Sequence, residues 1–190
     1  MSAEIESLPT GWRAILQSVQ TIEPGAILAG GAMRDWDNGR LWKDLDIFIP
    51  SGGNTRAITD MLRGKSYRQT RHFDAGYRNV DHTIEDVSTF EANAFEPPIG
   101  IIRMARELTP EQWLARFDFG ICQIAFDGQQ ITRTAAYLKD QAQRQFTVTR
   151  SDTPGQLERT RERFKRLREK YPDWTLVVPN NLPANRGTTL

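Results

Sequence analysis

The sequence has few of the residues on which zinc sites and disulfide frameworks depend. Its 190 residues include one cysteine, Cys122, and two histidines, His72 and His82. One thiol forms no internal disulfide, and these three side chains are too few for a Cys/His zinc site. We therefore expect neither a structural zinc nor an internal disulfide.

Long hydrophobic runs and an excess of charge are also missing. No uncharged apolar run approaches the roughly 18 to 20 residues that a membrane span requires, and residues 1–8 lack the basic cluster of a secretory signal. The 25 Lys and Arg nearly cancel the 24 Asp and Glu, which leaves a net charge of +1. Such a chain has no global field that drives non-specific nucleic-acid binding. We expect a cytoplasmic protein with no membrane partner, in which a local patch binds any polyanion.

Hydrophobic periodicity predicts a mixture of helices and strands. The helical pattern covers 12–19, 54–63, 135–145 and 153–171, and a further helix begins at 110. Strands are predicted over 26–29, 45–49, 67–73, 82–90, 99–104 and 121–126, with a short extended segment at 146–148. The two types do not alternate as in a doubly wound sheet. We therefore predict an α+β fold with a mixed sheet flanked by helices.

The length favours one domain with an appendage. We place the domain at 1–150, a basic C-terminal helix at 151–175 and a flexible tail rich in Asn, Pro, Gly and Thr at 176–190. The basic side chains of the helix are Arg159, Arg161, Arg163, Lys165, Arg166, Arg168 and Lys170. Two interpretations stay open, a solvated helix packed by its apolar stripe and a contact to an RNA backbone.

Two glycines followed by an arginine form the first informative motif. The predicted strand 26–29 runs into Gly30 and Gly31, and Arg34 lies about one turn into the helix expected next. Glycines at such a turn let a phosphate approach the backbone, and the N–H groups at the start of a helix favour its charge. Arg34 is placed to add a guanidinium contact. We therefore predict a phosphate-binding turn.

Two aspartates at alternating positions form the second motif. Asp44 and Asp46 flank the start of the predicted strand 45–49, so period two places both carboxylates on one face. Carboxylate oxygens bind hard divalent cations, and such a pair suits two Mg²⁺ ions. Combined with the glycine turn, the pair predicts a nucleoside-triphosphate (NTP) site that uses Mg²⁺ or Mn²⁺.

The combined pattern resembles the nucleotidyltransferase superfamily that includes DNA polymerase beta, and most closely the head domain of tRNA nucleotidyltransferases (CCA-adding enzymes) and bacterial poly(A) polymerases. That branch begins with Gly-Gly-x-x-Arg-Asp, then Gly-Arg, then Lys-Asp-x-Asp. The matching residues here are Gly30, Gly31, Arg34, Asp35, Gly39, Arg40, Lys43, Asp44 and Asp46. The resemblance implies a nucleotidyltransferase-type fold, metal binding by Asp44 and Asp46, and triphosphate binding by Gly30, Gly31, Arg34 and Lys43.

A second block of the same family begins at Arg116. The matching residues are Arg116, Asp118, Phe119 and Ile121. Phe117 and Cys122 stand where the family has a second Arg and an Asn, so a nucleotide or ribose contact is replaced there. The resemblance implies that Arg116 belongs to the nucleotide-binding residues.

The third catalytic carboxylate is the weakest part of this assignment. Two-metal nucleotidyl transfer commonly uses a further acid on a neighbouring strand, and Gly100 stands where the family places it. We assign Asp118 as the third catalytic acid, and the other candidates are Asp81, Glu85 and Asp86.

These motifs predict a Mg²⁺-dependent enzyme that transfers a nucleoside monophosphate from an NTP to an acceptor hydroxyl and releases pyrophosphate. The 151–190 segment is too short for the multi-helix body by which CCA-adding enzymes hold tRNA, so a small standalone form is expected. An RNA acceptor with a tRNA-like 3′ end is favoured, and a protein or small-molecule hydroxyl stays open. The alternative is a nucleotide-binding or interaction module of the same fold that has lost catalysis.

Overall fold

The computed structural model describes residues 3–73, 83–92, 96–151 and 154–180. The helices are α1 (Ala3–Glu6), α2 (Thr10–Gln20), α3 (Gly31–Asp37), α4 (Thr55–Gly64), α6 (Pro110–Leu114), the 3-10 turn η1 (Gly120–Cys122), α7 (Ala135–Gln143) and α8 (Pro154–Leu167). The strands are β1 (Ile27–Ala29), β2 (Leu45–Ile49), β3 (Arg68–Phe73), β4 (Ile84–Glu91), β5 (Ile99–Met104), β6 (Ile124–Phe126), β7 (Ile131–Arg133), β8 (Gln145–Thr147) and β9 (Thr175–Val177).

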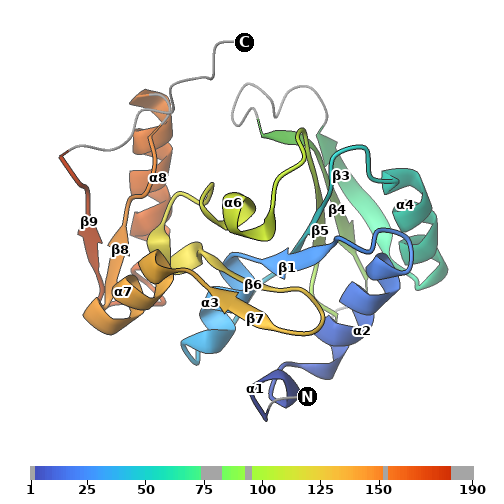
Figure 1. Cartoon of the computed structure of the whole chain (residues 1–190), viewed down its shortest axis with the longest axis horizontal. Coiled ribbons are helices and arrows are strands. Elements are labelled where there is room, and N and C mark those ends of the chain that lie inside the picture. The colour runs from blue at the N-terminus through green and yellow to red at the C-terminus, as the bar shows by residue number, and fades with distance from the viewer. Residues whose placement is uncertain (1–2, 74–82, 93–95, 152–153, 181–190) are drawn as a thin grey trace.

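Seven strands form one mixed sheet in the order β3-β4-β5-β2-β1-β6-β7. The central strand β2 pairs in parallel with β5 and antiparallel with β1. Strands β8 and β9 form a separate parallel pair beside α8 (Figure 1). The predicted α+β class with a mixed sheet flanked by helices is therefore confirmed.

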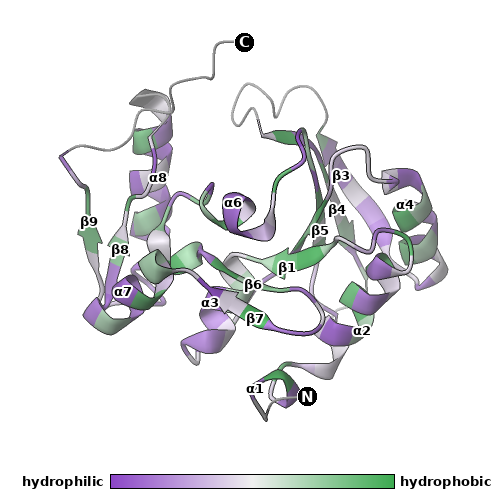
Figure 2. Ribbon diagram, viewed as in Figure 1, coloured by the Kyte–Doolittle hydropathy of each residue, from purple (hydrophilic) through white to green (hydrophobic). Residues whose placement is uncertain are grey.

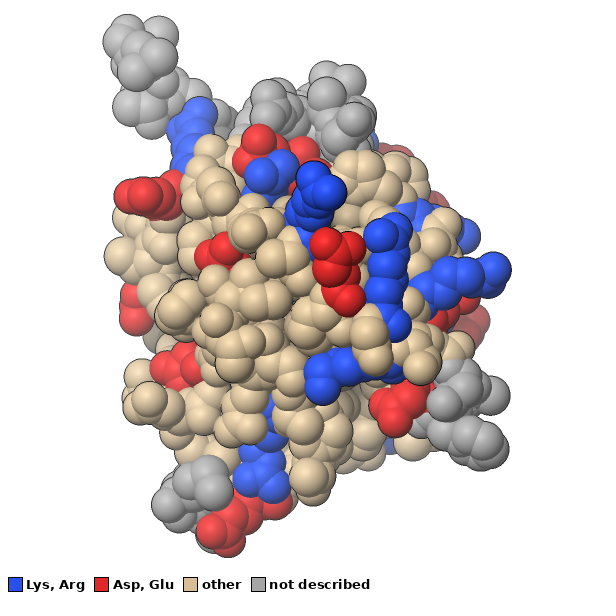
Figure 3. All heavy atoms as spheres, turned by 90° about the vertical axis from the view of Figure 1, so that its right-hand side faces the viewer, with Lys and Arg blue, Asp and Glu red and all other residues tan. Residues whose placement is uncertain are grey.

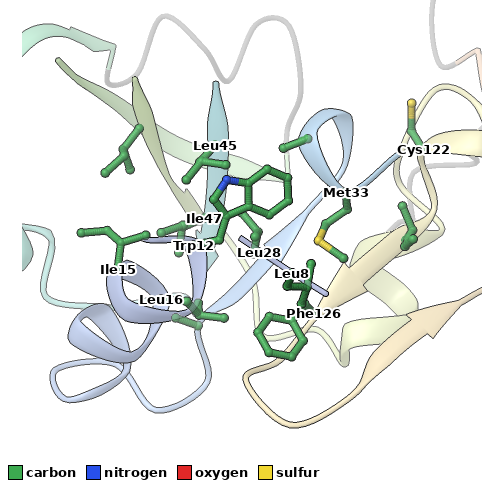
Figure 4. Close-up of a cluster of buried hydrophobic side chains, with 14 of the residues drawn as sticks. Leu8, Trp12, Ile15, Leu16, Leu28, Met33, Leu45, Ile47, Cys122 and Phe126 are labelled. Atoms are coloured by element: carbon green, nitrogen blue, oxygen red, sulfur yellow. The ribbon is translucent and has the colours of Figure 1, made fainter. Parts of the chain in front are cut away.

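The two faces of the sheet are covered by different helices. On one face, α2 and α4 bury their apolar stripes against the strands, since Trp12, Leu16 and Leu62 are almost fully buried. The residues of this core labelled in Figure 4 are Leu8, Trp12, Ile15, Leu16, Leu28, Met33, Leu45, Ile47, Cys122 and Phe126. On the other face, Trp113 and Leu114 of α6 pack with Phe48 and Ile102. Period-two alternation along β2 therefore places Asp46 on the α6 face, with Phe48.

Helix α8 and the β8–β9 pair form one end of the molecule, away from α2 and α4 (Figure 1). Phe146 of β8 lies edge-on to Phe164 of α8 and to Tyr171, with ring centroids 5.5 and 5.3 Å apart. Figure 2 shows α8 with hydrophobic and hydrophilic segments in turn along its length, as an amphipathic helix requires. Its apolar stripe holds it against the sheet domain.

Most predicted elements are present, and the differences have local causes. The segment 121–126 begins with η1 and only then becomes β6. The last long helix ends at Leu167 instead of extending to 175, because Pro172 cannot continue a helix. Val177, expected in the tail, lies in β9 opposite Thr147. Residues 181–190 of the expected tail, and His82 of the predicted strand 82–90, lie outside the described residues.

Within the described part of the chain, no helix is both long and apolar enough to cross a membrane.

Candidate active site

The two aspartates lie where β2 begins, and Asp46 lines a cavity. Asp44 is exposed and comes one residue before β2, whereas Asp46 is the second residue of the strand and is partly exposed. Burial by the surrounding protein and the negative charge of Asp44 raise the pKa of Asp46 to about 7, against the opposing charge of Arg163. The structure thus brings the two predicted metal ligands together.

Gly100 of β5 lies directly opposite Asp46 in the parallel β2–β5 register. A Cβ atom added to Gly100 would stand 2.5 Å from Oδ1 of Asp46, closer than such atoms approach in proteins. An acidic side chain at this position would therefore displace the Asp46 carboxylate. Asp46 therefore keeps its position because residue 100, where the resembled family has a third acid, is a glycine.

For the nucleotide transfer that we propose below, replacing Gly100 by Ala is expected to lower the rate by roughly 10²-fold, because a displacement of about 1 Å at a reacting group has that effect. The clash is with the end of one side chain, which can rotate, so the free energy of unfolding should change by less than about 1 kcal/mol. Turnover and thermal unfolding of the same preparation test this. Unchanged turnover would contradict the tight packing of Asp46 on Gly100.

The glycine turn is closed on one side by an aromatic ring. Gly30 has a φ of 82°, which favours glycine, and a Cβ atom there would lie 2.9 Å from the ring of Phe117. That ring also stands edge-on to Phe48, with centroids 5.4 Å apart. Phe117, which replaces an arginine of the resembled family, therefore joins the turn to the aromatic wall of the cavity.

Arg34 does not extend from the turn into the cavity. Only 3% of the residue is exposed. Its guanidinium forms an ion pair with Asp35 at 2.6 Å, donates to Sγ of Cys122 at 3.2 Å and lies over the ring of Tyr171. In this structure the guanidinium of Arg34 is therefore not placed to make the expected phosphate contact. Instead, Arg34 ties α3 to the C-terminal segment.

The cavity has a volume of about 390 Å³ and contains three of the predicted site residues. These are Asp46, Arg116 and Asp118. Its apolar wall includes Phe48, Trp113 and Phe117. Lys43, the remaining cationic candidate, is exposed at the residue before Asp44. An apolar wall beside clustered polar groups is the usual composition of a small-molecule site.

Arginines supply most of the charge in the cavity. They are Arg116, Arg150, Arg159, Arg163 and Arg166. Three of them come from one face of α8, which also directs Gln156 and Thr160 into the cavity. Five guanidiniums against two carboxylates favour an anionic ligand. Sequence reasoning assigned none of the α8 arginines to this site, although their spacing along one helical face was visible.

Asp118 is held by α8. Its Oδ1 accepts a hydrogen bond from Nη1 of Arg163 at 2.6 Å, and its side chain is 16% exposed. Across the described residues, no group of three or more His, Cys, Asp or Glu side chains has the geometry of a metal site. The structure therefore places Asp118 in the cavity but does not join it to Asp44 and Asp46 as a third metal ligand.

The other candidate acids lie elsewhere. Asp86 of β4 accepts from Nε of Arg103 at 2.6 Å, and Glu85 lies 3.6 Å from the same nitrogen. The β2–β5 and β4–β5 registers place Asp86 on the opposite face of the sheet from Asp46. Asp81 lies outside the described residues.

Two neighbouring carboxylates, one partly exposed and one exposed, suit one divalent cation with further ligands from outside the protein. Burial and the negative charge of Asp44 raise the pKa of Asp46, and a divalent cation bound by both carboxylates would offset this cost. Carboxylate oxygens are ligands that Mg²⁺ accepts. The donor set therefore fits the expected metal.

Comparison with known families identifies the chain. The model of the Gabija anti-defense 2 (Gad2) family matches residues 10–144, which is more than half of the chain. The chain belongs to the Gad2 family. The matched part of this Gad2 protein contains the glycine turn, Asp44 and Asp46, and ends before Arg150 and α8. No curated protein matches the chain.

Solved structures similar to this Gad2 protein are nucleotidyltransferase-like in fold. An apo form of a tRNA-processing enzyme has a TM-score of 0.64 at 16% identity over 93% of this chain and 46% of that chain. The CCA-adding enzyme of Bacillus stearothermophilus in complex with CTP has a TM-score of 0.56 at 17% identity over 92% and 41%. The Thermotoga maritima CCA-adding enzyme complexed with tRNA has a TM-score of 0.60 at 14% identity over 95% and 40%.

The likeness confirms the resemblance to CCA-adding enzymes at the level of the fold. The Gad2 chain spans less than half the length of these structures.

Proposed function

We propose that this protein is a metal-dependent nucleotidyltransferase that moves a nucleoside monophosphate from an NTP to an acceptor hydroxyl. The observation that carries the proposal is that Asp46, with Asp44 beside it, lines a cavity that also contains five arginines and three aromatic rings. The carboxylates suit a metal, the arginines suit a triphosphate, and the rings suit a base.

Each part of the cavity has a role in this reaction. Mg²⁺ bound by Asp44 and Asp46 would neutralise charge on the phosphates and lower the pKa of the attacking hydroxyl. Arg116, Arg159 and Arg166 hold the triphosphate. The acceptor oxygen forms a bond to the α-phosphorus, the bond from that phosphorus to the β-phosphate oxygen breaks, and pyrophosphate leaves while the hydroxyl proton passes to water.

A panel of acceptors scored by mass shift tests the proposal. The protein is incubated with each of the four NTPs, Mg²⁺ and one acceptor class, namely tRNA, cellular RNA, proteins or small alcohols, and pyrophosphate release is measured in parallel. A mass increase of one nucleoside monophosphate, matched by pyrophosphate, supports transfer and identifies the base. Absence of both with every acceptor contradicts it.

An RNA acceptor remains the first choice because the similar Thermotoga maritima enzyme is described in complex with tRNA. The family description, Gabija anti-defense 2, supports a role against the Gabija defence. We therefore include components of that defence system among the protein acceptors of the panel.

The second candidate function is nucleotide binding without transfer. It is favoured by the hydrogen bond from Arg163 to Asp118, because this contact occupies an oxygen of the acid that we assigned as the third catalytic carboxylate. Calorimetric binding of ATP with no pyrophosphate release from any acceptor would select this function.

A further inference from the structure

A second basic site lies at the opposite end of the sheet from β7. Helix α4 ends at Gly64, and the chain turns through Ser66, which has a φ of 68°, into β3. An open groove of about 660 Å³ follows this turn. Its charged lining residues are Arg63, Arg68 and Arg71, His72 lines it as well, and no carboxylate of the residues that the structure describes does.

The interactions of these arginines with other described residues are weak. The side chains of Arg63 and Asp60 are 59% and 62% exposed and stand 3.6 Å apart, so their ion pair contributes little to stability. Arg68 and Arg71 are exposed on β3, and Lys65 is exposed beside the turn. Figure 3 shows this side of the molecule, with Lys and Arg side chains gathered toward the right of the view and acidic side chains among them.

The groove is separate from the candidate active site. Strand β3 is three strands away from β2 in the sheet, which corresponds to about 14 Å at the usual spacing of neighbouring strands. The groove and the arginine-lined cavity share no lining residue. Its charge therefore has no part in holding the triphosphate.

The edge strand does not suit the addition of a partner's strand. The β3–β4 register shifts between Gln69 and Arg71, and such a bulge twists an edge away from further pairing. Arg68 and Arg71 add charge at the same edge, which also opposes strand addition. Recognition by side chains is thus favoured over recognition by the backbone.

We propose that the groove between the end of α4 and β3 binds the phosphodiester backbone of a single-stranded nucleic acid. Guanidiniums match phosphate oxygens in shape and charge, and a guanidinium can donate two parallel hydrogen bonds to one phosphate. Three of them along one groove, with polar Gln69 and Thr70 between, present a row of phosphate sites. The inference goes beyond the proposed transfer reaction and does not depend on it.

The test is the salt dependence of oligonucleotide binding. Affinity for oligoadenylate RNA and for its DNA counterpart of equal length is measured at several salt concentrations, without NTP, for wild type and for the Arg63→Gln/Arg68→Gln/Arg71→Gln variant. Each phosphate contact contributes about 0.7 to the slope of log affinity against log salt for single strands. The variant should lose about 2 from the slope and at least about tenfold in affinity.

The matched control removes the same charge from another surface. Arg106, Lys139 and Arg144 are exposed and line neither the groove nor the cavity, so their replacement by Gln should leave the slope unchanged. The single variants Arg68→Gln and Arg71→Gln, each expected to lose about 0.7, serve if the triple variant fails to fold. A difference in affinity between the RNA and the DNA oligonucleotide would show which backbone the groove prefers.

Equal slopes for wild type and the groove variant would overturn the proposal, as would an equal loss in the control variant. An acidic peptide that binds wild type but not the groove variant, with no salt-slope difference for the oligonucleotide, would reassign the groove to a protein partner. The binding assay contains no NTP, so a negative result in it would not contradict the proposed transfer reaction. A negative result in the transfer assay would likewise not contradict binding in the groove.

Discussion

Replacing both Asp44 and Asp46 by Asn is expected to reduce nucleotide transfer by at least about 10³-fold, because metal ligation contributes several kcal/mol to such transition states. The variant should remain folded. Asn is nearly the same size as Asp. The change removes both the burial of a charged carboxylate and its repulsion by Asp44, which together raise the pKa of Asp46. Pyrophosphate release and acceptor mass shift measure the loss, and thermal unfolding checks the fold.

The control for this experiment is Asp60→Asn, which removes an exposed carboxylate of α4. It should transfer nucleotide at the wild-type rate. A double variant that keeps more than one tenth of wild-type turnover would contradict the assignment of Asp44 and Asp46, whatever the acceptor. ATP binding by the inactive double variant, measured without metal, would further show that the arginines hold the triphosphate independently.

The local motifs of the site could be predicted from the sequence because each is contained in one short segment. Period two placed Asp44 and Asp46 together, and a buried strand before Gly30 was visible in its apolar run. The direction in which the Arg34 side chain points could not be predicted in the same way. Its partner Cys122 lies far along the chain, and only the folded core brings the two together.

The α8 arginines that line the cavity could not be predicted from local sequence either. The sequence showed a basic helix with two interpretations, solvated or in contact with RNA. The structure places Arg159, Arg163 and Arg166 in the cavity and Lys170 against Asp35. Which face of α8 turns inward depends on Phe164 packing against Phe146, a contact between elements whose pairing no local pattern encodes.

Asp35→Asn is expected to lower the free energy of unfolding by about 3 kcal/mol, the cost of leaving a buried charge unpaired. Asp35 is 2% exposed. Its carboxylate accepts from Arg34, from Nζ of Lys170 at 2.7 Å and from Oη of Tyr171 at 2.9 Å. Neutralising it leaves the guanidinium of Arg34 buried, with the sulfur of Cys122 and the ring of Tyr171 as its remaining partners.

The loss should be concentrated in the C-terminal segment. Lys170 and Tyr171 follow α8 directly, so Asp35 joins the glycine-turn helix α3 to the helix that supplies the cavity arginines. Chemical denaturation measures the total loss, and hydrogen exchange should show faster exchange in α8 and β9 than in β2 and β5. ATP should also bind more weakly to the variant, because the face of α8 with Arg159 and Arg166 is less firmly held. Unchanged exchange in α8 would show that Asp35 does not hold this segment, even if the total stability falls.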